Sequence, residues 1–317
     1  MWPFRKNKQQ PTSSRRVVED PFLGDPQAKR LHQALSGRDW TTARDILSGP
    51  MSNDDRAFYM ETAANVPGVQ DWIEGAVHDE PGSVLPLLVQ GAHAVFWAWE
   101  ARGTGTGDTV GEQQAKVWFR RLKLAEDCLD EVVDRDPKCL EAWYFLIVLA
   151  RARQLSTQER WHRYHKLIEL DPIHHYGHDQ MLQNLCAKWS GSAEEMFGFA
   201  RQRAAAAPGT ALPALIATAH LEHRWSQADD TAYMEQPEVV DEIAAAAEQS
   251  IWHPDYRTTV ATPYLWNRFA LAFSLADRFQ EARRCFDLIG ESYYTDNGWS
   301  TSHFLKLRDY VDSKLSN

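Results

Sequence analysis

Three prolines recur at a nearly constant spacing in the middle of the chain, and this spacing constrains the fold more than any other feature. Pro137, Pro172 and Pro208 lie 35 and 36 residues apart, and helical apolar periodicity precedes each of them. Because proline cannot continue a helix, each one indicates a turn between two helices. A period of about 34 residues with a proline in the turn is typical of stacked helical repeats. The sequence therefore predicts an all-α fold, an α-solenoid of antiparallel helix pairs.

Local signals agree with this prediction. The segments from Ser156 to Glu159 and from Ser192 to Glu195 have the pattern of capping boxes, in which both side chains bind backbone N–H groups at a helix start. Both segments stand where the second helix of a repeat is expected to begin. The apolar stretch LPLLVQGAHAVFWAW at 85–99 has helical spacing, and we expect it to lie in the core.

The chain resembles the tetratricopeptide repeat family, best in AWYFLIVLARA at 142–152 and in LWNRFALAFSLADRFQEARRCFDLI at 265–289. In the second segment, the residues at the family's successive packing positions are Trp266, Phe269, Ala270, Phe273, Phe279, Ala282 and Phe286. Gly91 occupies the family's small-residue position in an earlier repeat, and Ala125 and Leu129 fall on two further packing positions. The resemblance implies paired helices that approach closely at the small residues.

The repeat register divides the chain into a disordered basic tail at 1–20 and one helical repeat domain at 21–317. The expected elements are repeats near 31–80, 84–137, 140–172, 175–208, 211–254 and 263–290, and a capping helix at 299–316. Two loop insertions, at 102–114 and 225–238, lengthen the second and the fifth repeat. The first is rich in glycine but lacks the GxxxxGK[ST] pattern of a phosphate loop, so we expect a connecting loop.

A narrower resemblance concerns one turn of the chain. An uncharacterised bacterial family of repeat-like helical proteins is similar around KWSGSAEEMFGFAR at 188–201, where a Lys-Trp-x-Gly-Ser turn precedes a helix. Ser190 stands where that family has its first glycine. This resemblance implies no catalytic residues.

The charge of the chain argues against nucleic-acid binding. The formal net charge is −10, whereas binding to phosphates needs clustered Lys and Arg. The segment 1–16 is an exception, because it has five basic residues and no acidic one, which leaves −15 for the rest of the chain. Trp2 and Phe4 beside these cations allow at most a weak contact with an anionic membrane surface.

The cysteines favour a cytoplasmic location. Cys128, Cys139, Cys186 and Cys285 are far apart and form no CxxC pair, as expected for reduced thiols rather than a disulfide framework. The basic N-terminal segment also lacks the apolar stretch of a signal peptide. The predicted location is therefore the cytoplasm.

The candidate partner-binding residues are those at positions that face the concave groove in tetratricopeptide repeats. By resemblance they are Glu141, Tyr144, Val148, Arg151, Tyr176, Asp179, Gln183, Glu222, His223 and Asn267. Aromatic and Arg side chains are frequent anchors at protein interfaces. The predicted function is a non-catalytic scaffold or adaptor that binds a protein or peptide partner in this groove without a cofactor.

A group of histidines supports an alternative function. His162, His165, His174 and His178 lie close in the sequence, and the last two share a helix face, as a metal site requires. In the repeat register, however, His178 takes the position of a packing tryptophan. His174 and His175 flank a helix start, where the helix macrodipole favours neutral imidazoles. The alternative is a metal-binding or enzymatic helical protein.

Overall fold

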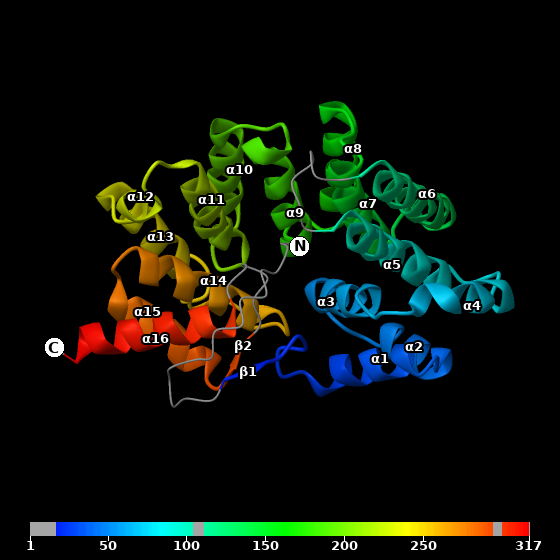
Figure 1. Ribbon diagram of the computed structural model, residues 1–317, viewed down its shortest axis with the longest axis horizontal. Helices are drawn as coiled ribbons and strands as arrows, with labels where there is room; N and C mark the ends of the chain where they lie inside the picture. The colour runs from blue at the N-terminus through cyan, green and yellow to red at the C-terminus, as the bar shows by residue number, and fades with distance from the viewer. Residues whose placement is uncertain (1–16, 104–110, 294–299, 317) are drawn as a thin grey trace. The chain divides into compact units, whose positions relative to one another are not determined.

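The computed structural model describes residues 17–103, 111–293 and 300–316 of the chain (Figure 1). Regular structure in these residues is almost entirely helical, with sixteen α-helices, α1 to α16, which confirms the predicted all-α class. Two strands of two residues each, β1 (Val18–Glu19) and β2 (Ser292–Tyr293), form a parallel pair in which Val18 lies opposite Ser292. So short a pairing does not change the fold class.

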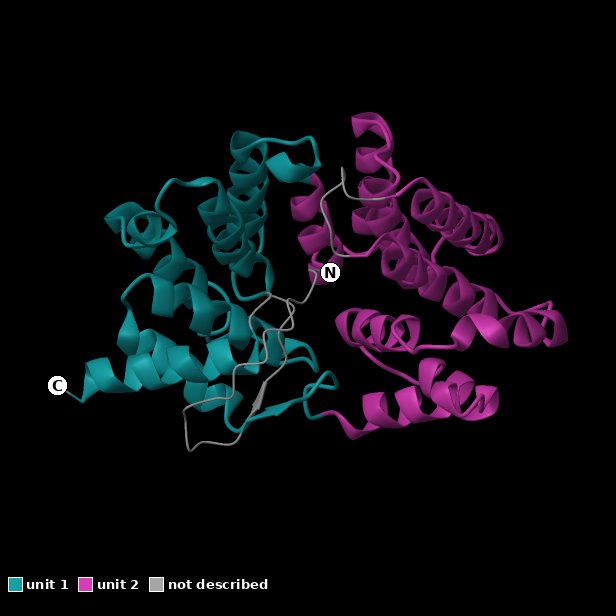
Figure 2. Ribbon diagram, in the orientation of Figure 1, with its two compact units in different colours: residues 1–24, 185–317 teal, residues 25–184 magenta. Residues whose placement is uncertain are grey.

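The described chain forms two compact units, drawn in different colours in Figure 2. The N-terminal unit, residues 25–184, contains α1 (Pro26–Ser36), α2 (Trp40–Leu47), α3 (Asn53–Ala64), η1 (Val69–Asp71), α4 (Ile73–Asp79), α5 (Leu85–Arg102), α6 (Glu112–Arg135), α7 (Leu140–Ala152), α8 (Thr157–Leu170) and most of α9 (His175–Leu185).

The C-terminal unit comprises the described residues before 25 and after 184. Besides β1 and β2, it contains η3 (Ala187–Trp189), α10 (Ala193–Ala206), η4 (Leu212–Ala214), α11 (Leu215–His223), η5 (Arg224–Ser226), α12 (Asp230–Met234), α13 (Pro237–Glu248), α14 (Thr262–Leu275), α15 (Phe279–Ile289) and α16 (Thr301–Leu315). The inserted segment 225–238 includes α12, and α16 falls within the range expected for a capping helix.

The predicted helix boundaries are confirmed at all three turn prolines. Helices α6, α8 and α10 end at Arg135, Leu170 and Ala206, so each stops one residue before the residue that precedes the proline. The serine half of each predicted capping box is present, because the hydroxyl oxygens of Ser156 and Ser192 accept hydrogen bonds from backbone N–H groups in the first turns of α8 and α10. Each serine thereby pairs a donor that the helix itself leaves without a partner.

Helices that follow one another in the chain pack together, among them α5 on α6, α7 on α8, α10 on α11 and α14 on α15. Most of the predicted packing residues are buried: Ala125, Leu129, Phe269, Ala270, Phe273, Ala282 and Phe286 are all 0% exposed. Trp266 and Phe279, predicted at the same kind of position, are partly exposed. A Cβ atom at Gly91 would lie 2.9 Å from Leu129 Cγ, so α5 and α6 approach each other too closely there for a larger residue. The close helix approach predicted at Gly91 is therefore confirmed.

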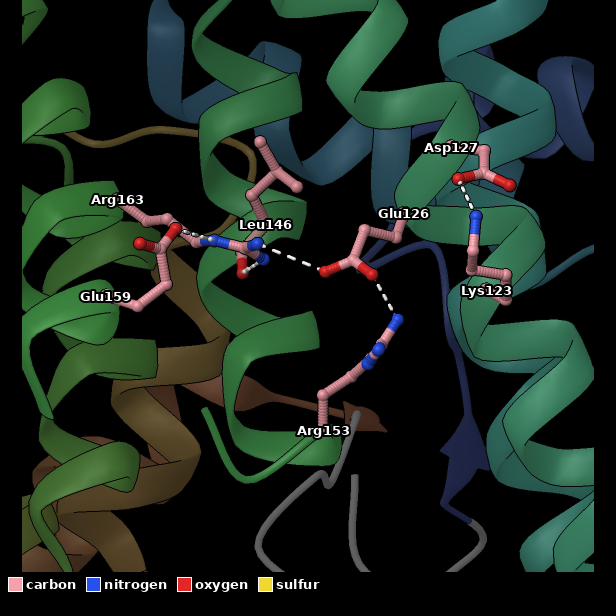
Figure 3. Close-up of polar contacts among 7 residues, drawn as sticks. All are labelled: Lys123, Glu126, Asp127, Leu146, Arg153, Glu159 and Arg163. Carbon is pink, nitrogen blue, oxygen red and sulfur yellow. Dashed lines mark hydrogen bonds and ion pairs between the residues drawn. The ribbon is translucent and has the colours of Figure 1, made fainter. Parts of the chain in front are cut away.

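A network of charged side chains joins α6, α7 and α8 (Figure 3). The carboxylate of Glu126 accepts hydrogen bonds from Arg153 and, at 3.2 Å, from Arg163. Arg163 is buried, and it also donates to the carbonyl of Leu146 at 3.0 Å and to Glu159 at 3.0 Å. Because the guanidinium has three acceptors, its burial between the helices is compensated.

The four cysteines are buried, and burial raises the pKa of the thiols of Cys128 and Cys139 to about 12. Among the described residues, no helix combines the length and the apolar character that crossing a membrane would require. The basic segment 1–16 and most of the first insertion lie outside the described residues.

Candidate partner-binding site

The predicted groove positions on α7 lie on one face of that helix and are buried. Tyr144 is 0% exposed, and Glu141, Val148 and Arg151 are 6%, 5% and 7% exposed. Their spacing of three or four residues places them above one another along the helix. Three of these four positions are polar or aromatic, so α7 carries a polar stripe, interrupted by Val148, within the core.

Tyr144 is the centre of the contacts between this stripe and its neighbours. Its hydroxyl group donates a hydrogen bond to Glu61 on α3. Its ring lies 5.9 Å from that of Tyr176 on α9, in an edge-to-face arrangement, and 6.1 Å from that of His174. The side chain therefore links α3, α7 and α9.

The remaining α7 residues extend this connection. Arg151 Nη1 donates to Gln180 Oε1 on α9 at 2.8 Å. At the other end of the stripe, Glu141 Oε1 lies 3.4 Å from Arg56 Nε on α3. Burial raises the pKa of Glu141, and Arg56 opposes this effect. Residues of α3, α7 and α9 thus form one polar and aromatic face, which we call the α3–α7–α9 face.

Two carboxyl groups of α3 have strongly perturbed acidity. Burial raises the pKa of Glu61 to about 7, and the charge of Asp179 adds to this effect while the Tyr144 hydrogen bond opposes it. Burial likewise raises the pKa of Asp54 to about 7, although its carboxylate accepts the backbone N–H of His175 at 3.2 Å. Both groups change charge close to neutral pH. Perturbed acids of this kind cluster at functional sites more often than elsewhere.

The structure brings together the predicted residues of α7 and α9, whereas His223 and Asn267 lie in the C-terminal unit. Tyr176 on α9 is 9% exposed, and Asp179 and Gln183 are partly exposed. Asn267 is 1% exposed, and its amide donates to the carbonyl of Pro263 in its own helix at 2.9 Å. The Nε2 atom of His223 is hydrogen-bonded to Gln227 at 2.8 Å.

Sequence reasoning missed Asp54 and Glu61. They are seven residues apart on α3, a spacing that places both on the same helix face. That spacing is the signal that could have identified them.

The histidines do not form a common site. His162 and His165 are exposed on α8, whereas His174 and His178 are 1% and 0% exposed. Within the described residues, no group of three or more His, Cys, Asp or Glu side chains is arranged to hold a metal ion. The structure therefore gives the metal-site hypothesis no geometric support.

His178 packs as the repeat register predicted. Its Nε2 atom lies 2.9 Å from the carbonyl oxygen of Pro172, which can only accept, so Nε2 carries the proton. Nδ1 then accepts the hydroxyl proton of Tyr164 on α8 at 2.8 Å. Burial lowers the pKa of His174 to about 4, which favours the expected neutral form through desolvation rather than through the helix macrodipole.

A second polar cluster lies in the C-terminal unit. His220 is 3% exposed, and its ring nitrogens lie 2.7 Å from the Tyr233 hydroxyl oxygen and 3.0 Å from a carboxylate oxygen of Glu242. Arg201 binds the same carboxylate at 2.6 and 3.0 Å and lowers its pKa. Since these residues come from α10, α11, α12 and α13, the cluster fastens the inserted helix α12 to its neighbours.

In comparisons with models of protein families and with curated proteins, the chain matched none.

Proposed function

We propose that this chain is a tetratricopeptide-like α-solenoid that acts as a non-catalytic scaffold and binds a protein or peptide segment on the α3–α7–α9 face. The observation that carries the proposal is the convergence of predicted groove residues of α7 and α9 next to α3. Tyr144, Arg151 and Tyr176 are buried and order this region, and the partly exposed Asp179 and Gln183 provide its surface. The turn prolines, the buried packing residues and the pairing of successive helices support the repeat architecture.

The chemistry of this face suggests the character of the partner. Tyr144 is fully buried and holds Glu61, so it orders the face rather than forming its surface. Asp179 and Glu61 are partly exposed acidic side chains, and Glu61 becomes negatively charged once the pH exceeds its raised pKa. Because opposite charges across an interface favour association, we expect the partner segment to present Lys or Arg side chains. We place this interaction in the cytoplasm, where buried thiols stay reduced.

The test compares partner capture by the intact chain and by variants of the face. Asp179→Ala combined with Gln183→Ala changes two partly exposed side chains of α9 and leaves buried Tyr144 in place. The control is Lys166→Ala combined with Glu169→Ala on α8, where the two side chains form an exposed ion pair at 3.6 Å. Proteins bound by the intact chain should be lost from the first variant and retained by the control, with unchanged helicity in both. If both variants capture the same proteins as the intact chain, the proposal is wrong.

A further inference from the structure

The outward face of α6 carries an ordered series of charges. Starting at Lys116, charged side chains recur every three or four residues along α6, so they lie on one side of the helix, and all of them are exposed. We call this series the α6 stripe: Lys116, Arg120, Lys123, Asp127, Asp130 and Asp134. The first three are basic and the last three are acidic. Glu112, one turn before Lys116, is also exposed and forms an ion pair with Lys116 at 2.6 Å. The opposite face of α6, with Leu122 and Leu129, is buried in the N-terminal unit.

Within the α6 stripe, the order of the charges is the reverse of the one that the helix macrodipole favours. The helix macrodipole favours acidic residues near the N-terminus and basic residues near the C-terminus. Glu112 in the first turn and Arg135 in the last turn follow this preference, whereas Asp134, also in the last turn, does not. Lys123 pairs with Asp127 four residues later, as Figure 3 shows, and this order is the less favourable one within a single helix.

The α6 stripe is complementary to itself when two copies lie antiparallel. About a centre at residue 125, Lys116 lies opposite Asp134 of the partner subunit, and Lys123 opposite Asp127 of the partner subunit. Arg120 likewise meets the partner's Asp130. At about 1.5 Å per residue the stripe is roughly 27 Å long, and all three pairs keep the same register. A twofold axis requires this kind of self-complementary surface.

Two apolar side chains flank the charges. Phe119 is 53% exposed and Leu124 is 37% exposed. Leu124 lies next to the centre of the antiparallel arrangement, where its copy from the partner subunit would also lie. Burial of these side chains adds an attractive contribution that salt does not screen.

We propose that α6 mediates a weak homodimer of this chain, in which the basic half of the α6 stripe pairs with the acidic half of a second copy. This dimer uses a different surface from the α3–α7–α9 face, so its test does not depend on the proposed partner-binding function. One helix face is far smaller than the roughly 800 Å² per partner of a standard interface, so we expect a dissociation constant on the order of 100 µM. In about 0.1 M salt, the repulsion between the two acidic chains is screened beyond about 10 Å, whereas the close ion pairs persist.

Sedimentation velocity over a range of concentrations tests this proposal with the full chain. The intact protein should dimerise at several hundred micromolar in about 0.1 M salt, and its dissociation constant should rise at least threefold in about 0.5 M salt. A monomer at the highest concentration, or an association that salt does not weaken, would overturn the proposal. This measurement requires no variant.

Charge reversal gives the sharper test. A basic-half variant (Lys116→Glu, Arg120→Glu, Lys123→Glu) and an acidic-half variant (Asp127→Lys, Asp130→Lys, Asp134→Lys) should each be monomeric, and an equimolar mixture should form a heterodimer. Both reversals follow the preference of the macrodipole, but they place like charges four residues apart along α6. Circular dichroism must therefore show that both variants keep the helicity of the intact chain. The control, Glu238→Lys with Glu248→Lys on the exposed face of α13, should dimerise like the intact chain.

A mixture that stays monomeric would overturn the proposal, since self-complementarity predicts recovery. The same holds if the acidic-half variant still associates with itself while the basic-half variant does not. That result would assign the basic half to a different acidic surface.

Discussion

Replacing Glu61 with glutamine is expected to stabilise the protein above neutral pH and to leave it nearly unchanged in mild acid. Burial raises the pKa of this carboxyl group from 4.5 to about 7. Between these values the folded state binds more protons than the unfolded state, so stability decreases as the pH rises through this range. Glutamine removes the ionisation, and its amide oxygen can still accept the hydroxyl proton of Tyr144.

The structure sets the size of this effect. At about 1.36 kcal/mol per pKa unit, the shift corresponds to roughly 3 kcal/mol of lost stability once Glu61 is fully ionised. Because the side chain is only partly buried, solvent reduces the effect, and we expect Glu61→Gln to be more stable than the intact chain by about 2 kcal/mol near pH 8. Near pH 5 the difference should be below about 0.5 kcal/mol.

Urea unfolding monitored by circular dichroism, repeated between about pH 5 and pH 8, measures this difference. Glu74→Gln, at an exposed position of α4 in the same unit, is the matched control and should shift stability by less than about 0.5 kcal/mol at every pH. The reasoning is refuted if Glu61→Gln has the same pH profile as the intact chain, or if it is the less stable protein near pH 8. Either outcome would mean that the folded protein stabilises the ionised carboxylate.

Three further substitutions test the packing, each by urea unfolding. Gly91→Ala should lower stability by about 1–3 kcal/mol because the new methyl group meets Leu129. The control Gly75→Ala, with open space around the new methyl group, should raise stability by about 0.5–1 kcal/mol. Equal effects of the two substitutions would contradict the close approach of α5 and α6. Ser190→Gly should stabilise the protein by about 1 kcal/mol, because Ser190 has a φ of 75°, a left-handed conformation that glycine adopts readily. A loss of stability would show that the serine side chain stabilises the fold by more than the backbone strain costs. Arg163→Ala should destabilise by about 3 kcal/mol, since it leaves buried acceptors without their donor, and a change below 1 kcal/mol would count against that role.

The helices and their boundaries could be predicted from the sequence because they depend on local chemistry. Pro137, Pro172 and Pro208 stop helices through their own ring geometry, and Ser156 and Ser192 cap the next helices through hydrogen bonds within one turn. These interactions join residues at most four positions apart. Any fold that kept these segments helical would show them.

The packing role of His178 was also predictable, because the repeat register gives its position along the helix. Its hydrogen bonds were not: Tyr164 Oη and the Pro172 carbonyl become its partners only once α8 and α9 pack. Ser190 is a similar case. The resemblance placed it where glycine is expected, but its left-handed conformation is a property of the folded turn.

Some features of the candidate site could likewise be predicted from the sequence, and others could not. Periodicity alone determined that Tyr144 and Arg151 share one face of α7, because a helix places residues seven apart on the same side. Only the tertiary structure decided that Tyr144 meets Glu61, which is 83 positions away in the sequence, and that burial then moves the acidity of Glu61 toward neutral pH. The physical reason is that desolvation and hydrogen bonding across helices depend on which faces meet, and a local sequence pattern does not contain that information.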